Sequence, residues 1–217
     1  VGGMPVRICP PPGDFVNWAF AGGAPQLFTI PVNGQARKVV GVAQKSGIYW
    51  AFDTATGDVV WSTLVGPYSE PGGLTWGAAY DGQRLYLSLT NFEHAPYRLL
   101  SGALTAGGSW AALDPITGKI LWQTADPQGG VDYAAPIVAN GVVYVGSLAH
   151  TGDQMYALDA ASGAILWRFA AGGSVGTHPA LADGSVFWGS GFGRVGFGGV
   201  PNNKFYAFTL DGKQPPK

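Results

Sequence analysis

Short stretches in which apolar and polar positions alternate run along most of the chain, and glycine-rich turns separate them. Alternation with a period of two is typical of a strand with one buried face. Asn-Gly or Asp-Gly, the strongest short hairpin signal, stands at 33–34, 81–82, 140–141 and 183–184. The flanking stretches predict four hairpins with two-residue turns: 24–30 with 39–43, 75–80 with 84–89, 134–138 with 142–147, and 177–181 with 185–190.

A longer repeat follows the first three of these hairpins. Residues 51–61, 112–122 and 157–167 all read Ala-x-Asp-x-x-(Ser/Thr)-Gly-x-x-x-Trp. A fourth copy begins at Ala207 and lacks the glycine and the tryptophan. The alanines of successive copies are separated by 61, 45 and 50 residues, which is close to the length of one β-propeller blade.

Each conserved position of the repeat has a physical role. The aspartate can accept hydrogen bonds from N–H groups of the turn that follows it. The glycine supplies the positive φ that ends such a turn. The tryptophan brings a large apolar ring to the next strand, where it can pack between sheets. We therefore expect Trp61, Trp122 and Trp167 to be buried between neighbouring blades.

These patterns predict an all-β fold, a β-propeller with four-stranded antiparallel blades. The blades are expected at about 24–66, 73–125, 131–171 and 174–210, and residues 1–23, rich in glycine and proline, are expected to form a loop or the tail of a preceding segment. The fourth blade lacks its outer strand, and an open end would expose a strand edge. We expect the missing half of the propeller to come from an upstream segment, a second chain or self-association.

Composition narrows the classes of function. Apolar residues make up 47% of the chain and charged residues 12%, and the net charge is −1, so no basic surface for nucleic acid is expected. No apolar run reaches the roughly 18 residues of a membrane span. The single cysteine, Cys9, cannot form an internal disulfide. Cysteine and histidine show no metal-ligand spacing and no Cys-x-x-Cys-His haem motif, so neither a metal site nor haem is predicted.

The expected strand directions place function on one face, which we call the top face. The inner strands begin there, and so do the long connections 90–108 and 191–203, a kind of loop that is often functional. Aligning the starts of the inner strands puts Trp76 and His178 at the mouth of the central channel. Lys45 lies in a short turn on the same face. A tryptophan that plugs the channel, a structural histidine and a solvated lysine are the alternative interpretations.

The repeat resembles the tryptophan-docking motif of pyrroloquinoline-quinone propellers. Residues 44–53 are similar to the stretch of quinoprotein alcohol dehydrogenases that carries a lysine in contact with the cofactor. The stretches 72–77, 107–122 and 203–208, with Gly189-Ser-Gly, resemble polyvinyl-alcohol-dehydrogenase-like proteins. The resemblance covers the chain from about residue 24.

This resemblance implies an eight-bladed ring of which the chain is roughly the C-terminal half. It implies pyrroloquinoline quinone with calcium as the cofactor, Lys45 and Trp76 as cofactor-binding residues, and an extracellular or periplasmic protein. The chain departs from the family at 19–25, where relatives tend to carry acidic residues before Ala-Pro, and it has no haem domain. The catalytic residues therefore stay unknown.

Two functions are consistent with the sequence. The first is part of a quinone-dependent alcohol-dehydrogenase-like propeller that oxidises a small alcohol, and Lys45 favours it. The second is a propeller without enzymatic activity that binds a glycan or a protein through its top-face loops, and the missing acidic ligands favour it.

Overall fold

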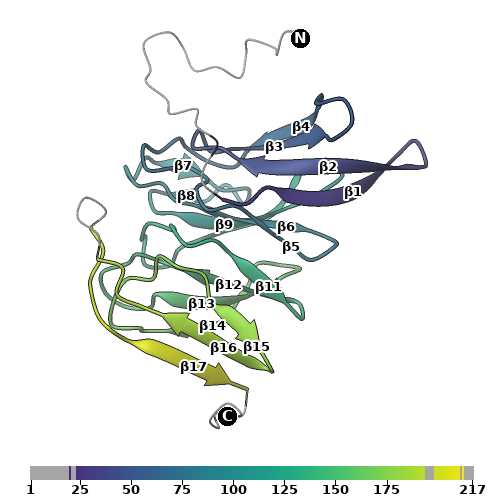
Figure 1. Cartoon of the computed structure of the whole chain (residues 1–217). Helices are drawn as coiled ribbons and strands as arrows, with labels where there is room; N and C mark the ends of the chain where they lie inside the picture. The colour runs from purple at the N-terminus through teal and green to yellow at the C-terminus, as the bar shows by residue number, and fades with distance from the viewer. Residues whose placement is uncertain (1–19, 21–22, 194–197, 211, 213–217) are drawn as a thin grey trace.

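The structure is a computed structural model that describes residues 20, 23–193, 198–210 and 212. Within these residues the chain forms strands and no helix, which confirms the all-β class. Three four-stranded antiparallel sheets and one three-stranded sheet follow one another in chain order (Figure 1). Residues 1–19 and Cys9 lie outside the described part of the chain.

We number the four sheets as blades 1 to 4 in chain order. Blade 1 contains β1 (Gln26–Val32), β2 (Gln35–Ala43), β3 (Ile48–Asp53) and β4 (Val59–Leu64). Blade 2 contains β5 (Ala79–Tyr80), β6 (Leu85–Leu89), β9 (Ser109–Leu113) and β10 (Ile120–Ala125). Blade 3 contains β11 (Ile137–Ala139), β12 (Val142–Gly146), β13 (Met155–Asp159) and β14 (Ile165–Phe169). Blade 4 contains β15 (Ala180–Ala182), β16 (Ser185–Gly189) and β17 (Phe205–Thr209). A separate hairpin, β7 (Tyr97–Arg98) with β8 (Leu104–Thr105), lies in the long connection of blade 2.

Two local predictions were wrong. The inner strands of blades 2 to 4 are only two or three residues long and begin later than expected. Pro136 and Pro179 precede β11 and β15, and a proline has no N–H to give to a sheet. The Asp81-Gly82 turn has four residues, because Tyr80 pairs with Leu85 and the Asp81 carboxylate accepts two N–H groups inside the loop at 2.7 and 2.8 Å.

The repeat joins each blade to the next. The Trp61 indole N–H donates to the Pro115 carbonyl of blade 2 at 3.1 Å, and the Trp122 N–H donates to the Ala160 carbonyl of blade 3 at the same distance. Both rings are buried, at 9% and 7% exposed. Each ring lies against the turn glycine of the next blade: a Cβ on Gly163 would stand 2.5 Å from the Trp122 ring. This confirms the expected place of the first two tryptophans.

Trp167 differs from its two counterparts. It is 37% exposed, and it contacts Phe169 and Phe208 through ring stacking and edge contacts. The prediction of burial was wrong here. The fourth copy of the repeat, in blade 4, lacks the aspartate and the glycine that shape the receiving turn in blades 2 and 3. The other turns have the expected geometry: the Asp53 carboxylate accepts the N–H groups of Ala55 and Thr56 at 2.7 and 3.1 Å.

The hydrophobic core lies between the blades. One cluster of buried side chains joins blades 1 and 2, a second joins blades 2 and 3, and a third joins blades 3 and 4. No blade has a core of its own, since both faces of an inner sheet pack against neighbours. This stack of sheets holds the loops between the strands on a rigid frame.

Candidate functional site

The turn that carries Lys45 and the loop that carries Trp76 are hydrogen-bonded to each other. The N–H of Gly73 donates to the Lys45 carbonyl at 2.9 Å, and the N–H of Leu74 donates to the Gln44 carbonyl at 3.3 Å. Gly73 allows this approach because a Cβ there would stand 2.6 Å from the Gly47 nitrogen. The structure thus brings two of the three candidate residues onto adjoining backbone segments.

Buried polar contacts fix the shape of the Lys45 turn. The Gln44 side-chain oxygen accepts the Trp50 indole N–H at 2.9 Å and the Ser46 hydroxyl at 2.7 Å. The Lys45 ammonium, on a half-buried side chain, donates to the Glu70 carbonyl at 3.4 Å. Within the described residues it forms no ion pair, and the Glu70 carboxylate accepts the Tyr68 hydroxyl at 2.6 Å. The positive charge of Lys45 is therefore not neutralised by a carboxylate in contact with it.

Trp76 is the exposed end of a row of aromatic rings. It is 44% exposed and rests edge-on against Tyr133, with ring centroids 5.4 Å apart at 87°. Tyr133 contacts Phe192 at 5.7 Å. The three rings come from the loops of blades 2, 3 and 4, so the position of Trp76 depends on the next two blades.

His178 does not join this group. Its side chain is exposed, and its Nδ1 lies 3.2 Å from the Pro179 carbonyl. No hydrogen bond or ring contact of the described residues connects it to Lys45 or Trp76.

Sequence reasoning missed Asp132, which stands directly before Tyr133. Its side chain is buried, and both carboxylate oxygens lack a hydrogen-bond partner among the described residues. Burial, followed by the negative charge of Asp126, raises the pKa of Asp132 well above its usual range. A signal existed: Gly129-Gly130-Val131-Asp132-Tyr133 parallels Gly72-Gly73-Leu74-Thr75-Trp76. Aligning the glycine pairs would have paired Tyr133 with Trp76.

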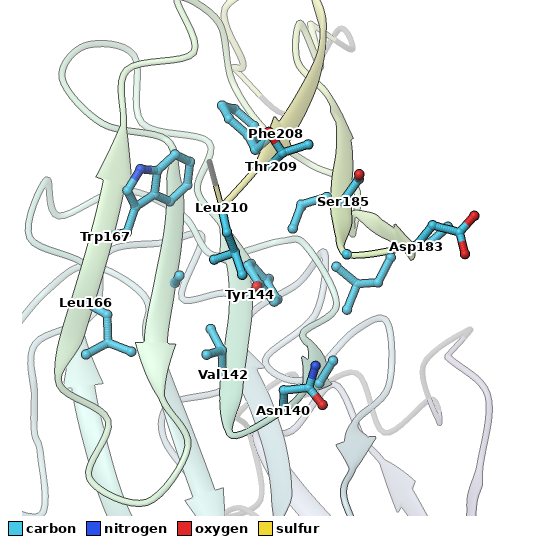
Figure 2. A pocket seen from close by; sticks show the side chains of 16 residues that line it. Asn140, Val142, Tyr144, Leu166, Trp167, Asp183, Ser185, Phe208, Thr209 and Leu210 are labelled. Carbon is cyan, nitrogen blue, oxygen red and sulfur yellow. The ribbon is translucent and has the colours of Figure 1, made fainter. Parts of the chain in front are cut away.

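A groove of about 710 Å³ lies between blades 3 and 4. Figure 2 shows Leu166 and Trp167 along one side, Asp183 and Ser185 along the other, and Tyr144 and Leu210 between them. Asn140, in the turn between β11 and β12, lies at its lower end in the figure, and Asp183, in the turn between β15 and β16, lies at the right. Within the described residues the sheet of blade 4 has no fourth strand, and β17 is its edge.

No three histidine, cysteine or acidic side chains of the described residues come close enough together to hold a metal ion. The same residues include no helix long and apolar enough to cross a membrane.

A family model described as outer membrane protein assembly factor BamB, built on repeats of the pyrroloquinoline-quinone type, matches residues 24–148 and 106–214. The chain belongs to this family. A curated relative is the polyvinylalcohol dehydrogenase of a Pseudomonas species, which is 29% identical over 222 residues, 88% of this chain and 33% of that protein. The chain spans about a third of the length of the curated relatives it matches.

Two solved structures share the fold of this BamB-family chain. Quinohemoprotein alcohol dehydrogenase from Comamonas testosteroni matches with a TM-score of 0.68 and 19% identity over 93% of this chain and 40% of that one. BamB from Moraxella catarrhalis matches with a TM-score of 0.56 and 20% identity over 81% of this chain and 47% of that one. The chain is therefore a propeller of the pyrroloquinoline-quinone type, and by name its relatives include dehydrogenases.

Proposed function

We propose that this chain is part of a quinone-dependent alcohol-dehydrogenase-like propeller, and that pyrroloquinoline quinone lies against Lys45 and Trp76. The observation that carries the proposal is the hydrogen-bonded junction between the Lys45 turn and the Trp76 loop. It presents a cation without an ion-pair partner next to a loop with an exposed aromatic ring. The names of the relatives supply the class of reaction.

The residues present fit a planar, negatively charged quinone. The Lys45 ammonium can pair with a negatively charged oxygen, since the single hydrogen bond it makes, to a carbonyl, leaves donors free. The Trp76 ring offers an apolar surface for stacking, and Tyr133 supports its edge. A bound quinone would supply the oxidant: it would take a hydride from the alcohol carbon while the hydroxyl proton leaves to solvent, and the product would be a carbonyl compound.

Among the described residues, no group of three histidine, cysteine, aspartate or glutamate side chains could hold a metal ion, so the calcium that this cofactor class takes would depend on other groups. We therefore derive no role for a metal from this chain. The chain's own part is to bind the quinone, to orient it and to offset its charge.

Cofactor binding tests the proposal. The full-length protein, mixed with pyrroloquinoline quinone and calcium, is expected to lose tryptophan fluorescence and to melt at a higher temperature, because a ligand that binds only the folded state stabilises it. Lys45→Ala is expected to weaken binding about tenfold, which is the loss of roughly 1.4 kcal/mol. Lys119→Ala, which changes an exposed lysine in the β9–β10 turn, is the matched control. Equal binding by both variants, or no binding by the native protein, would contradict the proposal.

The rest of the propeller is a second part of the proposal. β17 pairs only with β16 among the described residues, and the groove beside it is lined by Trp167 and Leu210. We propose that the missing propeller half covers this edge, as an upstream segment, a second chain or a further copy. We also place the protein in the periplasm or outside the cell, because the matched family model is described as a factor of outer membrane assembly.

A propeller that binds a glycan or a protein is the second candidate. The connection between β6 and β9 folds into its own hairpin, β7–β8, and Leu100 and Leu104 of this hairpin region are exposed. Exposed apolar side chains on an ordered loop are typical of a recognition surface. Retention on a glycan array that is lost in Trp76→Ala, without any response to quinone, would favour this function.

A further inference from the structure

The loop 126–133 encloses a pair of acidic side chains between blades 2 and 3. Asp126, at the end of β10, is buried and accepts four hydrogen bonds: the Ser147 hydroxyl at 2.5 Å, the Gln128 and Gly130 N–H groups at 2.8 and 3.0 Å, and the Tyr156 hydroxyl at 3.5 Å. Asp132 lies beside it with no such donors.

Among the described residues, no cationic side chain pairs with Asp132. A Cβ on Gly108 would stand 2.7 Å from one Asp132 oxygen and 2.7 Å from the Leu89 carbonyl, so backbone closes this side. The titratable groups that face Asp132 are Asp126, Tyr97 of β7 and Tyr156 of β13. None of them is a cation, and neither ion pair of the described residues involves Asp132. An isolated buried carboxylate without a partner is strongly disfavoured.

We propose that Asp132 is a neutral carboxylic acid in the folded protein and acts as a pH-sensitive latch for the loop that supports Trp76. Its proton can bridge to the charged Asp126, so one proton serves two carboxyl groups. When this proton is lost at higher pH, two negative charges share one buried site and repel each other. The loop 129–133 then opens, and Tyr133 moves away from the edge of Trp76.

Two backbone hydrogen bonds hold the loop 129–133 against the neighbouring blades. The Gly108 N–H donates to the Gly130 carbonyl at 2.7 Å, and the Leu148 N–H donates to the Val131 carbonyl at 2.9 Å. These two bonds attach the residues directly before Asp132 to blades 2 and 3. Opening the loop must break them, so their amide protons report the state of the latch directly. This inference does not depend on the quinone.

Stability against pH tests the latch. The folded state holds the Asp132 proton more tightly than the unfolded chain does, so folding binds a proton between the ordinary carboxyl range and the raised folded pKa. In this window the unfolding equilibrium constant of the native protein is expected to rise about tenfold per pH unit relative to that of Asp132→Asn. The asparagine variant stays neutral and keeps a donor toward Asp126. Asp58→Asn, a change at an exposed acidic residue, is the control and is expected to follow the native protein.

Amide exchange locates the effect. The ratio of the exchange rates of the Gly108 and Leu148 amides, native protein over Asp132→Asn, is expected to rise by up to about tenfold per pH unit within the same window. The Val65 amide, which donates to Gly47 in blade 1, is the internal control. If the Asp132 side chain only filled space, the ratio of exchange rates between the native protein and Asp132→Asn would not depend on pH.

Three results would overturn the latch. The first is a parallel pH dependence of the native protein and Asp132→Asn. The second is restored stability of the native protein at about pH 8 on addition of sodium or calcium ions, without such an effect in Asp132→Asn, because a cation and not a proton would then offset the charge. The third applies even if the variant fails to fold: the infrared carbonyl band of a protonated carboxylic acid must be present in the native protein near neutral pH, and its absence would contradict a neutral Asp132.

Discussion

The glycines of the blade turns offer a direct test of how the blades are joined. Gly57, Gly118 and Gly163 hold the same place in their turns, with φ values of 77°, 72° and 73°. A Cβ on Gly163 would stand 2.5 Å from the Trp122 ring, and one on Gly118 would stand 2.5 Å from the Trp61 ring. A Cβ on Gly57 meets no atom within 4 Å among the described residues. Alanine substitutions at these positions therefore separate the free-energy cost of placing a Cβ in the left-handed turn from the cost of disturbing the tryptophan contact.

All three alanine variants lose stability because alanine is strained at a positive φ. A residue with a Cβ in the left-handed region loses about 1–2 kcal/mol, and this is the whole expected effect at Gly57. At Gly163 the methyl group also pushes the buried indole aside, which costs about 1–3 kcal/mol as overpacking. The displaced ring loses its 3.1 Å hydrogen bond to Ala160, with a net cost of about 1 kcal/mol. We expect Gly163→Ala and Gly118→Ala to be destabilised by about 2–4 kcal/mol more than Gly57→Ala.

Urea unfolding followed by circular dichroism measures this difference, provided that the dependence on urea concentration is unchanged among the variants. Tryptophan fluorescence gives a second reading, because the displaced indole becomes exposed to water in Gly163→Ala and not in Gly57→Ala. Equal losses of stability at all three glycines would refute the inference that the tryptophan contact joins the blades.

Three further predictions concern the same frame. Trp122→Ala is expected to lower the free energy of unfolding by about 3–5 kcal/mol, as for other large truncations in a core. Trp167→Ala is expected to lower it clearly less, because that ring is 37% exposed. Similar losses for both variants in urea unfolding would argue against the difference in burial. The N–H groups of Ala55 and Thr56 lower the pKa of Asp53, so its contribution to stability is present above the unfolded pKa and is lost as pH falls through the folded pKa. The free energy of unfolding of Asp53→Asn should therefore fall less steeply with decreasing pH than that of the native protein. An equal fall in both proteins would count against this. Light scattering of residues 1–217 alone is expected to show particles larger than one chain, and a compact, stable monomer would contradict the proposed missing half.

The sequence predicted the features that depend on local chemistry. The Asn33-Gly34, Asn140-Gly141 and Asp183-Gly184 turns all have positive φ at both residues, as an Asn-Gly or Asp-Gly hairpin requires. The repeat predicted the strands on either side of Asp53 and the burial of Trp61, because its spacing fixes both the turn and the face of the outer strand.

The sequence did not predict features that depend on two distant segments. The Asp81 turn has four residues because its carboxylate bonds inside the loop and also accepts the Tyr86 hydroxyl at 2.7 Å. The contact of Trp76 with Tyr133 joins two blades: aligning the two glycine pairs shows that the residues are equivalent, but it does not show that their rings touch. The burial of Asp132 was missed for the same reason, since an acidic residue in a glycine-rich loop is usually exposed. The roles of Lys45, Trp76 and His178 in binding stay predictions.

The tryptophan contacts give the row of blades a direction. Blades 1 to 3 each carry the tryptophan and the turn glycine, and the two buried contacts run from blade 1 to blade 2 and from blade 2 to blade 3. No ring covers the Gly57 turn within the described residues. A neighbour that joined blade 1 through the same contact would place an aromatic side chain over Gly57, and such a head-to-tail joint is unlike the self-complementary joint of a twofold dimer. An assembly built on these contacts adds blades in one direction only, and it closes when the tryptophan of its last blade packs on the turn glycine of its first.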